Sequence, residues 1–212
     1  MASVFLRLAL VSATALMWAG CGDDDDSGSN VVTPPAATAD AGVCAEPPAP
    51  TKPAASCDVT ITLPPVVDNA AQHVPEGTVV SYCSNPPSSG PHYPVWADFQ
   101  AYTSEIPASY LVHDLEHGAV ELFYKCPEGC PDVVKALEEL RDAQPQDPLC
   151  TQYRIKSRVI VAPSSTIPTR VAAAAWGAIY TADCADKPTL AQFVTDHYGK
   201  GTEAICAPGR GF

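Results

Sequence analysis

The chain has 212 residues, which is room for one domain or for one domain and a tail. Its 12 basic and 24 acidic residues give a formal net charge of -12, which argues against a nucleic-acid partner because phosphate backbones select basic surfaces. The 22 prolines and 13 glycines argue against a helical bundle and favour loops and short strands. Nine cysteines argue against a reducing cytoplasm.

The first 20 residues have the pattern of a lipoprotein signal peptide. Arg7 is the single charge, and the apolar stretch 8–19 is shorter than the roughly 20 residues that a membrane-spanning helix needs. Two small residues precede Cys21, so we expect this cysteine to be lipidated and to begin the mature protein. The alternative is an ordinary signal peptide whose Cys21 enters a disulfide.

Residues 21–56 are expected to be the lipid anchor followed by a disordered tether. This segment begins with a run of aspartates and continues with proline- and alanine-rich sequence, which makes an extended, solvated spacer. We therefore expect a lipoprotein of the bacterial cell envelope, on the periplasmic face or the cell surface. It would contact the membrane through its N-terminal lipid and bind no nucleic acid, and the sequence names no protein partner.

Residues 57–212 are predicted to form one α+β domain, with a single mixed or antiparallel sheet and peripheral helices. Alternating residues predict a strand at 58–63, and further strands are predicted at 78–82, 119–124 and 158–161. The run 171–180 is rich in alanine and fits a helix as well, but the polar turn residues that bracket it favour a strand. A helix is predicted to begin at Pro131 and to continue through Leu140, and Thr189 is predicted to cap a second one.

The domain and tether contain an even number of cysteines, which predicts four disulfides that staple the fold. Two local pairs are suggested by proximity in the chain, Cys44 with Cys57 and Cys126 with Cys130. A zinc or redox site at Cys126 and Cys130 is the functional alternative, but structural disulfides are the stronger expectation in an exported chain. The eight cysteines are Cys44, Cys57, Cys83, Cys126, Cys130, Cys150, Cys184 and Cys206.

Four histidines are candidate metal ligands. His92 lies in a loop with four prolines, which restrict the backbone before folding. His113 and His117 are four residues apart and share a face on a helix or on a strand. With His73 as a fourth ligand, these imidazoles could hold one transition-metal ion, and oxidised cysteines and a mature chain without methionine leave Cu(II) or Zn(II) as the expected metal. Glu116 and Asp114 are expected to hydrogen-bond to the histidine ligands without binding the metal themselves.

The histidine-bearing segments resemble a bacterial family catalogued as domain of unknown function 3105. The motifs that carry the resemblance are His73-Val74-Pro75-Glu76-Gly77, the loop 85–94 and the segment 111–120, with a weaker match at Ala175-Trp176-Gly177. The resemblance covers roughly residues 70 to 205. It implies the fold and the histidine-bearing segments, and it implies no activity.

Two other functions fit parts of the sequence. The segment 113–117 reads H-x-x-E-H, the signature of a zinc metallopeptidase in which His113 and His117 bind zinc and Glu116 is the general base, with a carboxylate such as Glu203 as third ligand. A lipid anchor and a stapled domain also suit a non-enzymatic binding or assembly module without metal. The sequence favours the histidine metal site over both alternatives and does not favour an enzyme.

Overall fold

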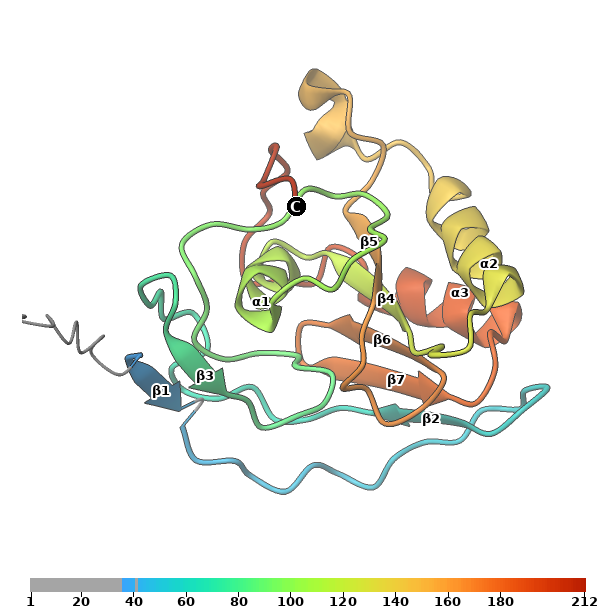
Figure 1. Ribbon diagram of the computed structural model, residues 1–212, viewed down its shortest axis with the longest axis horizontal. Coiled ribbons are helices and arrows are strands. Elements are labelled where there is room, and N and C mark those ends of the chain that lie inside the picture. Colours follow the sequence, from blue (N-terminus) through green and yellow to red (C-terminus); the bar gives the residue numbers. More distant parts are fainter. Residues whose placement is uncertain (1–35, 41) are drawn as a thin grey trace, which may run out of the picture. The chain divides into compact units, whose positions relative to one another are not determined.

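The structure is a computed structural model that describes residues 36–40 and 42–212 of the chain. The signal peptide, Cys21 and the first part of the expected tether lie outside these residues, so the predictions made for them stay predictions. The described part forms a mixed five-stranded sheet, a small two-stranded sheet and peripheral helices (Figure 1). This is the α+β architecture that the sequence predicts. None of its helices is long and apolar enough to cross a membrane.

The large sheet has the strand order β2-β7-β6-β4-β5. β4 and β5 are parallel, and every other neighbouring pair is antiparallel. The five strands are β2 (Val59–Thr62), β4 (Val120–Tyr124), β5 (Val159–Pro163), β6 (Val171–Ala175) and β7 (Ala178–Ala182). The predicted strands at 58–63, 119–124 and 158–161 are therefore confirmed.

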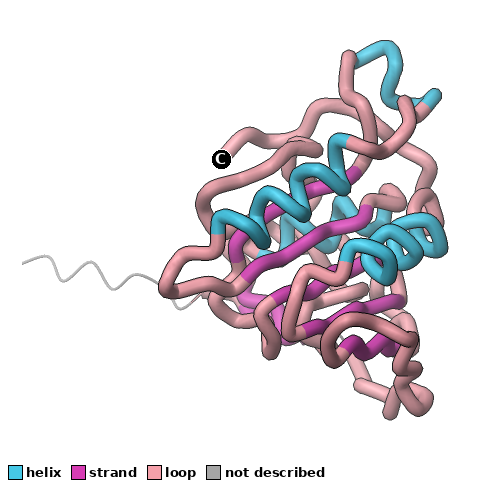
Figure 2. Tube along the Cα trace, turned by 90° about the vertical axis from the view of Figure 1, so that its right-hand side faces the viewer, coloured by secondary structure: helices cyan, strands magenta, loops and turns pink. Residues whose placement is uncertain are grey.

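Helices cover both faces of this sheet. α2 (Pro131–Asp142) and α3 (Lys187–His197) pack on one face, and α1 (Ala108–Glu116) packs on the other (Figures 1 and 2). Because side chains alternate along a strand, Leu122 of β4 packs with α2 and α3, whereas its neighbour Phe123 packs with α1. The sheet is consequently buried on both sides, and α1 is held between the sheet and the loops that carry the histidines.

The alanine-rich run 171–180 forms a β-hairpin rather than one strand. β6 and β7 are joined at Trp176 and Gly177, and Gly177 has a φ of 68°, which glycine adopts at little cost. The predicted helix at 131–140 is confirmed as α2. The second predicted helix is confirmed as α3, but its cap is Asp186, whose carboxylate accepts a hydrogen bond from the N–H of Thr189 at 3.1 Å. An aspartate three residues upstream thus does the capping expected of Thr189.

The small sheet pairs a strand from the expected tether with a strand of the domain. β3 (Val79–Ser81), the strand predicted at 78–82, pairs in parallel with β1 (Thr38–Asp40). Further along, Thr51 and Ile61 exchange backbone hydrogen bonds of 2.8 and 2.9 Å. The described residues between 36 and 56 are therefore attached to the domain at several points, which differs from the free tether that their composition suggested. A 3-10 helix, Pro148–Tyr153, lies between α2 and β5.

All eight predicted cysteines are in disulfides, and the expected pairing of Cys126 with Cys130 is confirmed. The expected pair Cys44–Cys57 is wrong. Because β1 pairs with β3, the chain after β1 reaches the chain after β3, and Cys44 bonds to Cys83. The remaining bonds are Cys57–Cys184 and Cys150–Cys206. Four disulfides indicate a protein that resides outside the cytoplasm.

Candidate metal centre

Two loops and one helix face bring the histidine-bearing segments together. His73 and His92 lie on neighbouring chains, where Val74 N–H donates to the carbonyl of His92 at 2.8 Å. His113 and Glu116 are three residues apart on α1 and therefore share a face of the helix. One ligand atom each from His73, His92, His113 and Glu116 lies within 4.8 Å of the other three.

The end of α1 is set by a close backbone contact. The helix ends at Glu116, and Gly118 then takes a φ of +82°. A Cβ at Gly118 would lie 2.9 Å from Cα of Gly199, so the chain passes too close for any other residue. This turn directs the chain into β4 and places His117 beyond the last helical residue.

Two backbone carbonyls fix the orientation of the two buried imidazoles. Nδ1 of His92 lies 2.9 Å from the carbonyl oxygen of Gly90, and Nδ1 of His113 lies 2.6 Å from that of Tyr93. A carbonyl can only accept, so Nδ1 of each ring carries the proton and, in a neutral ring, Nε2 carries the lone pair. Both lone pairs are thereby available to a metal, and hydrogen bonding of the far ring nitrogen to a carbonyl is the usual support of a metal-bound histidine.

The carboxylate of Glu116 completes the cluster. Its Oε2 lies 3.1 Å from Nε2 of His92 and 3.9 Å from Nε2 of His73, and its Oε1 accepts a hydrogen bond of 3.3 Å from Thr202. Glu116 is 3% exposed and His92 is 0% exposed. Two hydrogen-bond acceptors face each other here out of reach of water, and only a cation between or beside them, a proton or a metal ion, makes the contact favourable.

The environment keeps the buried imidazoles neutral. Burial lowers the pKa of His92 and of His113, an effect that the hydrogen bonds to backbone carbonyls offset in part. Burial, together with the neighbouring His113 and His92, lowers the pKa of His117 to about 3. Metal ligation requires the neutral ring, so these residues are in the ligand form at neutral pH.

His117 lies beside the four-residue cluster. Its Nε2 is 3.2 Å from Nε2 of His113 and 3.3 Å from Oε2 of Glu203, and its buried Nδ1 has no hydrogen-bond partner among the described residues. Glu116 was expected to hydrogen-bond to the ligands, but here it offers a ligand atom itself. His117 was expected to be a ligand, but it lies beside the four-residue cluster. The ligand assignments stay predictions. The spacing of three between His113 and Glu116 fits one helix face and is the local signal for Glu116, whereas the position of His117 at the edge depends on where α1 ends.

Among the described residues, the carboxylate of Asp114 makes no hydrogen bond to a histidine ring. It is 0% exposed, and its Oδ2 accepts the backbone N–H of Ala97 at 3.0 Å, while burial raises the pKa of its carboxyl. It therefore fixes the loop that follows His92. That loop also supplies Trp96, whose indole ring lies 5.2 Å from the ring of His113 and 4.7 Å from that of His117. The indole shields this side of the cluster, and the half-exposed His73 forms its solvent side.

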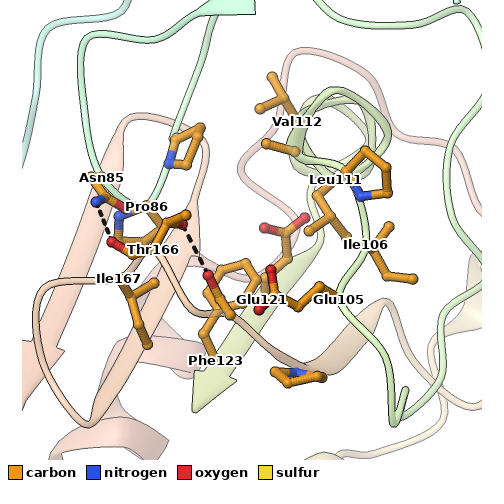
Figure 3. A pocket seen from close by; sticks show the side chains of 15 residues that line it. Asn85, Pro86, Glu105, Ile106, Leu111, Val112, Glu121, Phe123, Thr166 and Ile167 are labelled. Carbon is orange, nitrogen blue, oxygen red and sulfur yellow. Dashed lines mark hydrogen bonds between the residues drawn. The ribbon is translucent and has the colours of Figure 1, made fainter. Parts of the chain in front are cut away.

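A separate cavity of about 210 Å³ contains a residue that the sequence analysis did not single out. Figure 3 shows Glu121 of β4 among the apolar side chains of Ile106, Leu111 and Phe123. Glu121 is 1% exposed, and burial raises the pKa of its carboxyl. Within the part of the chain that the structure describes, its Oε1 has no hydrogen-bond partner. Such a carboxyl is protonated over a wider pH range than an exposed one. It lies outside the histidine cluster.

Comparison with known proteins places the cluster in a family context. No curated protein and no solved structure matches the chain. A family model described as "Protein of unknown function (DUF3105)" matches residues 73–208. The matched range is more than half of the chain and begins at His73, so it includes every residue of the cluster. The chain therefore belongs to the DUF3105 family.

Proposed function

We propose that the protein is an exported lipoprotein of the bacterial cell envelope that binds one Zn²⁺ or Cu²⁺ ion through His73, His92, His113 and Glu116. The observation that carries the proposal is the orientation of the two buried imidazoles. Their Nδ1 atoms are bound to carbonyls at 2.9 and 2.6 Å, which leaves both Nε2 lone pairs for a shared cation. Holding ligands in place before the ion arrives lowers the entropic cost of binding it.

The donor set supports these two metals over others. Imidazole is a good ligand for zinc and for copper, whereas calcium and magnesium prefer sites made of oxygen alone. The eight cysteines that the structure describes are in disulfides, so they offer no thiolate. The two methionines, Met1 and Met17, both lie in the predicted signal peptide, which removes thioethers from the mature chain. The carboxylate of Glu116 would offset part of the charge of a divalent ion.

A second candidate is the zinc peptidase that the H-x-x-E-H segment suggests. The contacts of 3.2 Å between His113 and His117, and of 3.3 Å between His117 and Glu203, favour it. Zn–N bonds of about 2.0–2.1 Å place two tetrahedral imidazole nitrogens about 3.3 Å apart. In this candidate Glu116 acts on the zinc-bound water and is no ligand, so the two proposals differ in what Glu116 does.

Metal titration of three variants tests the proposal. His73 is half-exposed, so His73→Gln removes a ligand with little damage to packing, and we expect zinc or copper affinity to fall at least about ten-fold. His117→Gln should change the affinity less. His197→Gln is the matched control, since His197 lies on α3 away from the cluster, and it should bind metal like the wild type. Equal affinity in His73→Gln and the wild type, with a large loss in His117→Gln, would favour the peptidase site instead.

The lipid anchor is proposed from the signal-peptide pattern, and the four disulfides support export. We expect the mature protein to begin at a lipid-modified Cys21. Intact-mass measurement on protein extracted with detergent from its native membrane checks this. Recovery of an unmodified N-terminus at another residue contradicts the anchor and leaves the metal proposal untouched.

A further inference from the structure

One disulfide differs from the other three in the length of chain that it closes. Cys126 and Cys130 are four residues apart, whereas the other pairs are separated by 39, 127 and 56 residues. A disulfide stabilises a fold largely by restricting the unfolded chain, and that effect grows with the length of the loop. The Cys126–Cys130 bond is therefore the one whose opening the fold tolerates best.

This bond lies at the junction of β4 and α2 (Figure 1). β4 ends at Tyr124, and Cys130 is the N-cap residue of α2, which leads on to β5, the parallel neighbour of β4. A cysteine pair between the strand and the helix of such a β-α-β unit is the arrangement of thioredoxin-type oxidoreductases, in which two residues separate the cysteines. Here three residues, 127–129, separate them.

The two sulfurs differ in access. Cys130 is 7% exposed and stands at the N-terminus of α2, whereas Cys126 is partly exposed. Cys126 also lines an open pocket of about 220 Å³ together with Tyr124, Pro163 and Ser164. Tyr124 and Pro163 are paired at the carboxyl ends of β4 and β5, the edge where parallel sheets bind ligands. An incoming thiol can reach Cys126 from this pocket.

Charged residues of both signs flank the bond. Glu128, the acidic residue between the two cysteines, is paired with Arg170 at 2.9 Å, and Asp132 lies in the first turn of α2. Lys125 precedes Cys126 and donates a hydrogen bond to the carbonyl of Ile167 at 3.0 Å. The feature that favours a thiolate at Cys130 is the N-terminus of α2, because a helix N-terminus lowers the pKa of a thiol and makes it a better leaving group.

We propose that Cys126–Cys130 is a redox-active disulfide that accepts two electrons from a pair of thiols on another exported protein. A substrate thiolate attacks Sγ of Cys126. The Cys126–Cys130 bond breaks, and its electron pair leaves on Sγ of Cys130, where the N-terminus of α2 stabilises the charge. The second substrate thiolate then attacks the substrate sulfur of the mixed disulfide and releases Cys126 as thiolate. The substrate gains a disulfide, and the protein takes up the two electrons and two protons as a pair of thiols.

Selective reduction tests whether this bond is the reactive one. The folded wild-type protein is equilibrated with glutathione buffers of decreasing potential, alkylated, and mapped by mass spectrometry. We expect Cys126 and Cys130 to be labelled while the other six cysteines remain in disulfides. Labelling of any other pair first, or labelling of all eight together as the protein unfolds, overturns the proposal.

Trapping tests the order of attack. Cys130→Ser leaves a free thiol at Cys126 and should form a mixed disulfide with an oxidised synthetic peptide that carries two cysteines. Cys126→Ser leaves only the buried Cys130 and should react at least about ten-fold more slowly. Equal trapping by both variants overturns the assignment of Cys126 as the attacked sulfur.

Transfer to a reduced two-cysteine peptide measures the function itself. Wild-type protein should oxidise one equivalent of peptide, and the double variant Cys126→Ser/Cys130→Ser should oxidise none, although its other three disulfides remain. Transfer by the wild type is also measured with a metal chelator, which empties the histidine site and leaves the disulfide intact, so failure of the exchange and failure of the metal site are distinguishable. Absence of transfer by the wild type at all tested pH values overturns the proposal.

Discussion

Nε2 of His92 lies 3.1 Å from Oε2 of Glu116, and the far nitrogen of that imidazole is already committed to the carbonyl of Gly90. Both facing atoms are acceptors when the ring is neutral and the carboxylate is ionised. Without a cation the two buried atoms repel each other, and with a metal ion between them both act as ligands. The contact therefore becomes favourable when a proton or a metal ion lies between the two atoms.

Glu116→Gln should separate these two states. The amide can donate to Nε2 of His92, so we expect the metal-free variant to be at least as stable as the metal-free wild type. The same change removes an anionic ligand, so the rise in melting temperature on adding zinc should shrink or vanish. Calorimetric scans of both proteins with chelator and with zinc check this. In the peptidase candidate, the variant keeps its zinc and the full rise in melting temperature.

Gly118→Ala should destabilise the fold and the site together. A residue other than glycine at a positive φ costs about 1–3 kcal/mol, and at Gly118 a Cβ would also meet Cα of Gly199 at 2.9 Å. Gly77→Ala is the matched control, because Gly77 has a φ of +87° with nothing within 4 Å of its Cβ. Chemical denaturation should show a larger loss for Gly118→Ala than for the control. Equal losses would mean that the backbone at Gly199 moves aside at no cost.

Glu121 predicts a pH dependence of stability with a definite sign. Burial raises the pKa of its carboxyl in the folded protein, so the folded state holds the proton to higher pH than the unfolded state. Its contribution is therefore complete below the pKa of an unfolded glutamate, about 4.3, and decreases as the pH rises above that value. The variant Glu121→Gln has no titratable group at this position, so its stability lacks this pH dependence.

The measurement is the difference in melting temperature between Glu121→Gln and the wild type from pH 4 to pH 7. We expect the difference to shift in favour of the variant as the pH rises. Glu105→Gln, at an exposed residue that lines the same cavity, is the control and should show a smaller trend. A difference that is flat with pH would show that Glu121 titrates normally.

The sequence was sufficient for the features that depend on local patterns. Residue patterns predicted most strands and helices, and the spacing of His113 and His117 predicted that their side chains share a face in either secondary structure. The spacing did not say where the helix ends, which is decided by the approach of Gly199 to Gly118. That contact joins segments about eighty residues apart, and no local pattern reports it.

Two other features have the same origin. The strand pattern at 119–124 does not indicate that Glu121 is buried, and it is buried because the sheet is covered on both faces and α1 packs on its side. Proximity in the chain suggested Cys44–Cys57, whereas the pairing of β1 with β3 selects Cys83 for Cys44. Both features depend on tertiary arrangement, which local patterns do not report.

Metal binding should also stabilise the folded protein measurably. A ligand that binds only the folded state at 100 times its Kd adds about 2.7 kcal/mol to the free energy of unfolding. For a domain of this size that corresponds to a rise of roughly 5–10 °C in melting temperature. Scanning calorimetry with increasing zinc checks this, with magnesium as the control ion, which an imidazole-rich site should not bind.

X-ray absorption at the metal edge tests the central claim most directly. Untagged mature protein is loaded with one equivalent of zinc, and the spectrum reports the atoms that surround the ion. The account predicts one ion per chain with imidazole nitrogens and a carboxylate oxygen at about 2.0–2.2 Å and no sulfur. A spectrum with sulfur at about 2.3 Å, or a protein that retains no zinc or copper after gel filtration, would contradict it.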